Sequence, residues 1–529
     1  MSGFDDVVTV RSLEVEVAVE RDGQPIAGLP RSAFELRVDD RPAEIDFFAE
    51  VRDGRVVATE GVASSLPIDS EVGLDFVVFI DDAFVVRRDR DRLLDLIENQ
   101  LPALRSSDRL ALVAYDGRQV DTLSGLTDSR PVLERALDRA RQRPAYGLQR
   151  RSEAQRAQTE IRQRSRTSRS FASIGFDGAR GTAAGSARSA LLRDRLATSG
   201  GLSGTEVGLR EWLERLASAA AASIERFADG DRRKVLLFAA GGLQDLDADL
   251  RAVFGDADRE AEAIDEIYRP LIAAANRLGF TIFPTSAGGA GGLLASIQLA
   301  DASSNGRGLS DRTRSGAGFD LAAARTLAAA TGGRPLFGGA RSQLLDEAGM
   351  SARTFYWLAF TPTFEGDDTR SDLEVRVAAP GASVRSRSSF DDLSIERQLD
   401  QLLVGAHLFG TPFEASLDAR LGTPEASGVG RMRVPLRLEI PLDDVTATPS
   451  DDTWSTRLVL RILGTDDRGD TATVAPIVLE LEAPQTPRPG QITAYETTLE
   501  LRRRPHRLLV ALYDPLAGTL LGRQIEVEP

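Results

Sequence analysis

The sequence contains no cysteine and only two histidines. The absence of cysteine excludes disulfide bonds, thiolate metal ligands and cysteine nucleophiles. His407 and His506 lie far apart in the sequence, so the chain has too little material for a histidine-rich zinc site or a histidine-dependent catalytic triad. Histidine is also the commonest general base of enzymes. These absences favour a protein without catalytic activity.

Long apolar runs are missing as well. No stretch reaches the roughly 20 apolar residues of a membrane-spanning helix, so we expect no membrane span. The segment Met1–Asp6 has neither the basic nor the apolar region of a signal peptide. The compartment stays open, because a trimmed signal peptide would mean an extracytoplasmic or secreted protein, and otherwise the protein is cytoplasmic.

Positive charge is scarcer than negative charge. The chain has 65 Lys and Arg residues against 80 Asp and Glu residues, for a formal net charge of -15. This balance favours solubility and disfavours nucleic acid or an anionic membrane surface as the main partner. Lys234 is the only lysine, a bias that indicates a GC-rich genome rather than a functional demand. We therefore expect a protein partner.

The 529 residues are too many for one hydrophobic core, so two to four domains are expected. Apolar and polar residues alternate over residues 8–19 and 34–38, which is the period of half-buried strands. Such a β-unit is too short to stand alone, and so are the strands after residue 355. We predict that residues 1–65 and 355–392 pack together as one β-sandwich, with another domain inserted between them.

Residues 66–354 show a different pattern. Continuous apolar runs at 76–80, 110–115, 235–238 and 280–283 are typical of buried parallel strands. Apolar residues recur at helical spacing between these runs. Strands that alternate with helices indicate βαβ units and a mostly parallel, doubly wound sheet.

A low-complexity segment interrupts this α/β pattern at about residues 141–203. It is rich in Arg, Gln, Ser, Ala and Gly, which predicts an insertion that protrudes from the domain. Its basic residues predict either a solvated helix or tail, or a surface for an acidic protein patch. The partner-binding candidates are Arg150, Arg151, Arg156 and Arg162.

Two further segments follow the predicted inserted domain and its β-sandwich. Residues 393–429 are expected to form a helical or linker segment. Residues 430–529 again show short alternating runs separated by turn signals, which predict a separate C-terminal β-sandwich.

The order of several short motifs resembles the VWFA-related proteins described from Acidobacteria. The motifs are Gly28-Leu29 with Phe34 and Val38-Asp39-Asp40, Val78 to Asp82, Arg233 to Phe238 with Gly241, Ala274 to Gly279, Thr331-Gly332-Gly333, Tyr356 to Phe360, and Val384 to Arg387. The resemblance implies a von Willebrand factor A fold in a bacterial, usually exported protein of unknown partner. The fold class predicted on both grounds is multidomain α/β plus all-β, with a doubly wound, mostly parallel von Willebrand factor A-type sheet flanked by antiparallel β-sandwich domains.

The family's Mg²⁺ site, a metal-ion-dependent adhesion site, is degenerate in this sequence. The family motif supplies an aspartate and two serines after the first sheet strand, a threonine from a later loop, and an aspartate after the fourth strand. This chain keeps Asp81 but has Ala83 and Val85 in place of the serines, and Ala240 in place of the later aspartate. Thr127 matches the threonine. Because Mg²⁺ requires six oxygen ligands, we expect no bound cofactor unless Asp82 or Asp245 rebuilds the site.

Three functions follow from these observations. The favoured function is a non-catalytic protein–protein interaction or scaffold module with a degenerate metal site. The alternative is a metal-dependent adhesion module with a rebuilt Mg²⁺ site made from Asp81, Asp82, Thr127 and Asp245. A hydrolase that uses the three aspartates is the third. Adjacent residues at a strand end point to different faces, so Asp81 and Asp82 are expected to cap a helix or to be relics rather than to form a catalytic pair.

Overall fold

The structure is a computed structural model in which the described residues fall into two compact units. The described residues are 12–61, 67–147, 149, 204–228, 232–240, 257–286, 323–336, 343–410 and 415–529, apart from 447, 451–452, 468, 470 and 485–486. The first unit spans residues 1–117 and 121–393, and the second spans 118–120 and 394–529. Each unit is described by itself.

The first unit contains two antiparallel sheets that join the two ends of its sequence. One sheet has the order β14-β1-β12-β5-β6, with β2 also paired to β1, and the other has the order β15-β13-β3-β4. The strands are β1 (Leu13–Arg21), β2 (Gln24–Pro25), β3 (Phe34–Val38), β4 (Arg41–Ala43), β5 (Phe47–Arg52), β6 (Arg55–Gly61), β12 (Phe355–Phe360), β13 (Thr369–Val377), β14 (Ser383–Arg385) and β15 (Ser389–Asp392).

These two sheets share one apolar core. Val17 on β1 pairs with Tyr356 on β12, and Leu36 on β3 pairs with Val375 on β13. All four side chains are buried in the same cluster. In the first fifty residues, the apolar side of each alternating strand therefore faces a core. Residues more than 300 positions later in the chain complete that core.

The third sheet of this unit is the one that contains the continuous apolar runs. Its order is β11-β10-β7-β8-β9, with β7 (Leu74–Asp81), β8 (Arg109–Tyr115), β9 (Val120–Thr127), β10 (Arg233–Ala240) and β11 (Phe280–Ser286). β11, β10, β7 and β8 pair in parallel. The four parallel strands predicted from the apolar runs are confirmed. β7 is buried along its whole length, as expected when both faces of a strand are covered.

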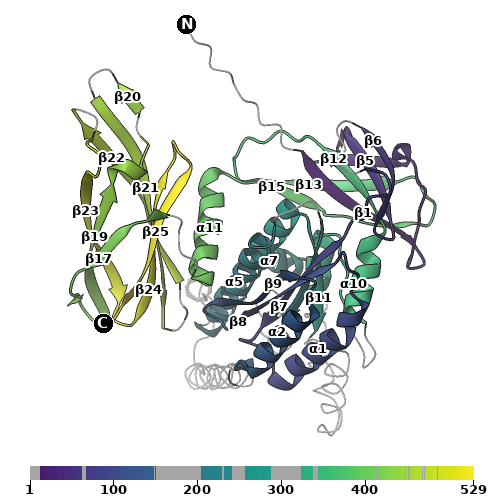
Figure 1. Ribbon diagram of the computed structural model, residues 1–529, viewed down its shortest axis with the longest axis horizontal. Coiled ribbons are helices and arrows are strands. Elements are labelled where there is room, and N and C mark those ends of the chain that lie inside the picture. The colour runs from purple at the N-terminus through teal and green to yellow at the C-terminus, as the bar shows by residue number, and fades with distance from the viewer. Residues whose placement is uncertain are drawn as a thin grey trace, which may run out of the picture. The chain divides into compact units, whose positions relative to one another are not determined.

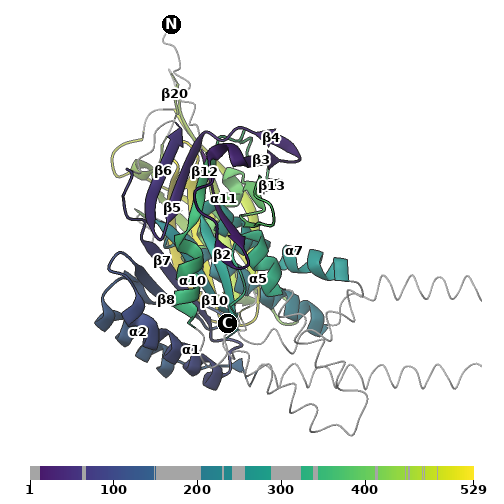
Figure 2. The same ribbon diagram turned by 90° about the vertical axis from the view of Figure 1, so that its right-hand side faces the viewer.

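Helices cover this sheet (Figures 1 and 2). They are α1 (Arg87–Gln100), α2 (Arg130–Gln142), α5 (Gly204–Glu225), α7 (Ala257–Leu278) and α10 (Leu344–Arg353), and a short 3₁₀ turn, η2 (Leu101–Ala103), follows α1. Side chains of α1, α2 and α10 pack against alternate residues of β7 and β8, such as Val78 and Leu112. The intervening residue Phe79 contacts Phe238, which meets Tyr268 of α7 edge-on.

The predicted fold class is wrong for this chain. The chain is mostly β, is built from several antiparallel sheets, and is not a doubly wound parallel von Willebrand factor A sheet. Parallel pairing within the described residues joins β7, β8, β10 and β11, and it also occurs in an isolated bridge between Thr285 and Leu336 and in the short contact of β16 (Ala415–Ser416) with β25 (Thr519–Val527). Four buried strands are easy to recognise in the sequence from their continuous apolar runs. The antiparallel strands are half-buried, so their alternating pattern is weaker, although they contain more residues.

In its described residues, the second unit contains one α-helix, a 3₁₀ turn at Leu442–Asp444 and two further sheets. The helix is α11 (Ile395–Phe409), and the other strands are β17 (Asp418–Leu421), β18 (Glu425–Ala426), β19 (Arg431–Pro441), β20 (Thr448–Ser450), β21 (Thr453–Asp466), β22 (Thr471–Ala483), β23 (Ile492–Arg502) and β24 (His506–Asp514). The sheets have the orders β16-β25-β24-β21-β20, with β22 on β21, and β17-β19-β18, with β23 on β19. Alternate residues of β19 are buried, and they face Leu458, Leu460 and Val510 in a common core.

Helix α11 has the sequence signals of both of its ends. Ser394 caps its first turn by accepting a hydrogen bond from the Arg397 N–H, and Gly410 ends the helix in the left-handed conformation at φ 59°. This is the conformation that glycine adopts without steric cost. Leu399 and Leu403 pack on Leu509 and Ala511 of β24. Among the described residues, no helix is both long and apolar enough to cross a membrane.

Candidate functional site

The carboxyl end of β7 is the site where the sequence predicts metal or catalytic chemistry. Asp81 is the last residue of β7 and is fully buried. Its Oδ1 accepts a hydrogen bond from the Ala83 N–H at 3.1 Å. The Val85 N–H donates to the Asp81 carbonyl at 3.0 Å. Asp81 therefore fixes the turn that leads from β7 into α1.

Asp82 is bound by two arginines of its own chain. Its Oδ1 accepts from Arg90 Nη1 at 3.0 Å, and its Oδ2 accepts from Arg143 Nε at 2.6 Å. Arg90 lies on α1 and has a fully buried side chain. Arg143 follows α2 and also pairs with Asp121 on β9. One carboxylate therefore ties together the end of β7, the start of α1 and the end of α2.

The remaining donors of Arg90 are also engaged. They reach the carbonyl oxygens of Arg141 and Arg143 at 3.1 and 3.0 Å, and the side chain of Asp91 at 3.2 Å. Burial raises the pKa of the Asp82 carboxyl, and the hydrogen bonds and charges of Arg143 and Arg90 oppose that rise. We name this group the strand-end ion cluster; its members are Asp82, Arg90, Arg143 and Asp121. It contains two arginines and two aspartates, and each of them forms an ion pair within the cluster.

The backbone at Gly147 covers the turn after β7 that would have to hold a metal. Ala83 and Val85, which stand in place of the family's serines, are 0% and 1% exposed. The Gly147 N–H donates to the Val85 carbonyl at 3.2 Å. A Cβ atom on Gly147 would lie 2.4 Å from the Phe84 carbonyl oxygen, so only glycine permits this approach. The turn offers apolar side chains and a covering backbone instead of hydroxyl ligands.

Thr127 lies at the other end of the sheet from Asp81. The Leu112 N–H donates to Ser124 on β9, and Asp128 acts electrostatically on Arg109 at the start of β8. Arg109 in turn pairs with Asp75, six residues before Asp81 on β7. The Thr127 Oγ1 accepts from the Ser129 N–H at 3.1 Å, just before α2. The structure therefore gives Thr127 a turn-forming role and does not bring it to Asp81.

Several sequence-predicted residues lie outside the described part of the chain. These are Asp245, Arg150, Arg151, Arg156 and Arg162. Within the described ranges, no three His, Asp or Glu side chains gather as a metal-binding group. Ala240 is the last residue of β10 and brings no oxygen ligand in its side chain.

Sequence reasoning missed the two arginines of the strand-end ion cluster, although a signal for Arg90 exists. Arg90 precedes Leu93, Leu94 and Ile97 at intervals of three, four and seven residues. It therefore lies on the buried stripe of α1. A charged residue on such a stripe requires a buried partner of opposite charge, and the nearest upstream carboxylate at a strand end is Asp82.

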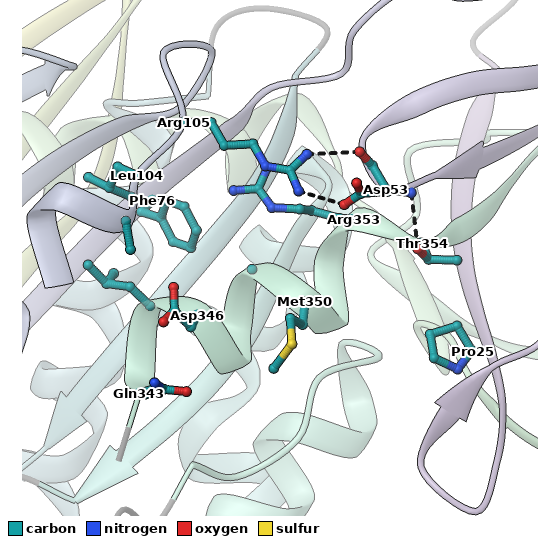
Figure 3. A pocket seen from close by; sticks show the side chains of 13 residues that line it. Pro25, Asp53, Phe76, Leu104, Arg105, Gln343, Asp346, Met350, Arg353 and Thr354 are labelled. Atoms are coloured by element: carbon teal, nitrogen blue, oxygen red, sulfur yellow. Dashed lines mark hydrogen bonds and ion pairs between the residues drawn. The ribbon is translucent and has the colours of Figure 1, made fainter. Parts of the chain in front are cut away.

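A second candidate site is a pocket in the first unit, with a volume of about 440 Å³. It lies among α10, the η2 turn and the turn at Asp53 (Figure 3). The lining combines apolar side chains with two arginines. Arg105 pairs with Asp53, which also lines the pocket, and Arg353 pairs with Asp108, which does not. Its residues come from five separate stretches of the sequence, so no local pattern predicts it.

Comparisons with known proteins do not identify the chain. No family model and no curated protein matches it. Among solved structures, a target of the Northeast Structural Genomics Consortium aligns over 21% of this chain and 86% of its own length, with 10% identity and a TM-score of 0.15. Bacteroides uniformis beta-glucuronidase aligns over 33% of this chain with 12% identity and a TM-score of 0.16, and the aligned part is 19% of that enzyme.

Similarities this weak carry no argument about function. They also do not indicate a von Willebrand factor A domain.

Proposed function

We propose that this chain is a non-catalytic protein–protein interaction or scaffold module. One observation carries the proposal: Asp82 at the carboxyl end of β7 is held by Arg90 and Arg143 of the same chain. The carboxyl ends of parallel strands are where open α/β sheets bind ligands. Here the guanidinium groups of Arg90 and Arg143 occupy both oxygens of the Asp82 carboxylate, which a metal or a substrate would otherwise bind.

The energetics support this proposal. A metal that took Asp82 as a ligand would remove a partner from Arg90, whose side chain is 0% exposed. Breaking a buried ion pair in this way costs about 3–5 kcal/mol. Mg²⁺ also needs six oxygen ligands, and the adjacent side chains of Ala83 and Val85 supply none. A metal or substrate that binds Asp82 would therefore have to displace Arg90 or Arg143 from it.

The partner is proposed to be a protein. The net charge of -15 makes nucleic acid and anionic membrane surfaces unfavourable. Binding would then depend on surface side chains of the two units and not on the strand-end carboxylates.

The test compares partner retention by the full chain in Mg²⁺ and in a chelator, and repeats it with Asp81→Ala. The proposal expects the same retained protein, in the same amount, under all four conditions. Retention that requires Mg²⁺ and is lost in Asp81→Ala would instead establish the metal-dependent adhesion module. Hydrolysis of an ester, phosphoester or glycoside substrate that is lost in Asp81→Ala would establish the hydrolase.

A further inference from the structure

The pocket bounded by α10, η2 and the Asp53 turn contains a carboxylate that the proposed function does not use. Asp346 lies in the first turn of α10 and lines the pocket together with Leu104, Arg105 and Met350 (Figure 3). Its side chain is half-buried. A pocket of about 440 Å³ falls within the range of small-molecule sites.

The two arginines of the pocket are already neutralised. Arg105 Nη2 lies 2.6 Å from Asp53 Oδ1, and Arg105 Nη1 donates to the Asp53 carbonyl at 2.9 Å. Arg353 donates to both carboxylate oxygens of Asp108, at 2.5 and 3.2 Å, and Asp108 is fully buried. These pairs leave no guanidinium charge unmatched in the pocket.

Asp346 differs from the carboxylates of Asp53 and Asp108, which pair with the two arginines of the pocket. Within the described chain, no hydrogen bond or ion pair joins its carboxylate to another side chain. Its position in the first turn of α10 places it near the positive end of the helix dipole, which offsets about half of one charge. The pocket therefore keeps a negative excess.

Apolar side chains line the same pocket as this carboxylate. Leu104 and Ala103 are among the lining residues, and Met350, one turn further along α10 than Asp346, is 62% exposed. The flexible thioether of a methionine adapts to varied apolar ligands. The lining suits a ligand with an aliphatic stem and a charged end.

We propose that this pocket binds an alkylammonium or alkylguanidinium group, with the cation at Asp346 and the aliphatic stem against Leu104 and Met350. The group is supplied either by a free amine or by a lysine or arginine side chain of another protein. An anion would have to approach Asp346 and displace Asp53 from Arg105. The inference goes beyond the proposed function and does not depend on it, because the pocket shares no residue with the strand-end ion cluster.

The test uses the full chain with methyl-¹³C methionine and titrates hexylammonium, with hexanoate as the probe of opposite charge. The chain has three methionines. Met350 lines the pocket, whereas Met432 is buried in the second unit at 2% exposure and serves as the internal control. Hexylammonium is expected to shift the Met350 signal saturably and to leave the Met432 signal unchanged. Hexanoate is expected to shift neither.

Two variants locate the charge that binds. Asp346→Asn is expected to weaken hexylammonium binding about tenfold, the effect of removing one charged hydrogen-bond partner. Glu347→Gln is the matched control, because Glu347 is also an acidic residue in the first turn of α10 but does not line the pocket. It is expected to leave the affinity unchanged, and thermal unfolding of both variants checks that the fold is intact.

The outcomes separate cleanly. Equal binding of hexanoate, equal weakening in Glu347→Gln, or no shift of the Met350 signal would each overturn the inference. A capped lysine peptide that binds as well as hexylammonium supports the inference and points to a protein side chain as the source. A peptide that fails where hexylammonium binds supports it with a free amine as the source.

Discussion

At the scale of single residues, the strand-end ion cluster is governed by the cost of burying charge. Arg90 has five guanidinium N–H groups in a fixed planar arrangement, and its contacts are Asp82, Asp91 and two backbone carbonyl oxygens. A buried pair of this kind adds little net stability when it is complete, but removing one partner leaves an uncompensated buried charge. Its residues should therefore respond strongly to substitution.

Asp82→Ala is expected to destabilise the first unit by about 3–5 kcal/mol, because Arg90 then keeps its charge without its buried carboxylate. Urea denaturation measures the change. Arg92→Ala on the same helix is the control. Arg92 is 49% exposed and lies 3.6 Å from Asp89, so its loss is expected to cost under about 1 kcal/mol. Similar losses in the two variants would contradict the account.

His407 provides a pH-dependent term in the second unit. Its Nε2 lies 2.7 Å from Thr465 Oγ1, and the side chain is 2% exposed. Burial, together with the charge of Arg507, lowers the pKa of His407 from 6.5 to about 4. The folded state therefore favours neutral histidine. Stability is fully present above the unfolded pKa of 6.5 and falls as the pH drops toward 4, by about 3 kcal/mol in total.

Calorimetric unfolding between pH 7 and pH 4 checks this window. His407→Gln is expected to remove the His407 part of the decline, whereas His506→Gln is expected to retain it. A decline of the same size in His407→Gln would show that other groups carry the pH dependence.

At the scale of elements, buried polar contacts connect β1 to the parallel sheet. Glu16 on β1 forms an ion pair with Arg233 on β10 at 2.7 Å and accepts a hydrogen bond from Arg387 at 2.9 Å. Asn276 on α7 donates to the carbonyl oxygens of Ala330 and Ser389. Apolar packing has no direction, so such contacts give these elements a specific register against one another.

Glu16→Gln is expected to destabilise the first unit by about 3 kcal/mol at neutral pH, because two buried arginines lose their shared carboxylate. Burial acts to raise the pKa of Glu16, but the charges of Arg233 and Arg387 outweigh it and hold the pKa below 4.5. Wild-type stability from this group is therefore present above pH 4.5 and is lost as the pH falls through the lower, folded pKa. Urea midpoints of the two proteins should converge in acid. A constant gap would contradict this.

Close backbone approach is a second constraint at this scale. A Cβ atom on Gly333 would lie 1.9 Å from the Ile282 carbonyl oxygen on β11, whereas one on Gly125 would meet nothing within 4 Å. Gly333→Ala is expected to cost at least about 1–3 kcal/mol from the forced backbone shift. Gly125→Ala is the matched control, with an effect within about 0.5 kcal/mol. Thermal unfolding compares them, and equal Tm values would contradict the account.

At the scale of the whole molecule, the sequence predicts buried elements better than their assembly. The run at 76–80 identifies β7 because a strand buried on both faces needs continuous apolar residues. The pairing of Val17 with Tyr356 follows from no local pattern, since the partners lie 339 positions apart. The fold class was wrong because the chain is mostly β, with several antiparallel sheets such as the long pairings of β19 and β21, whereas the prediction gave the parallel sheet marked by the apolar runs the main weight.

The candidate site shows the same division. The sequence itself shows that Ala83, Val85 and Ala240 replace oxygen ligands. It does not predict the direction of β9, which places Thr127 at the opposite end of the sheet from Asp81. The approach of Arg143 to Asp82 across 61 positions likewise depends on how α2 packs against α1. Sequence patterns thus report what a site lacks more readily than what replaces it.

The most direct test of the central claim is calorimetric titration of the full chain with Mg²⁺ and Mn²⁺, alongside Asp81→Ala. The strand-end ion cluster predicts no saturable heat in either protein and no rise in Tm on adding metal. Saturable binding to the wild type that disappears in Asp81→Ala would contradict the account and establish a metal site at the end of β7.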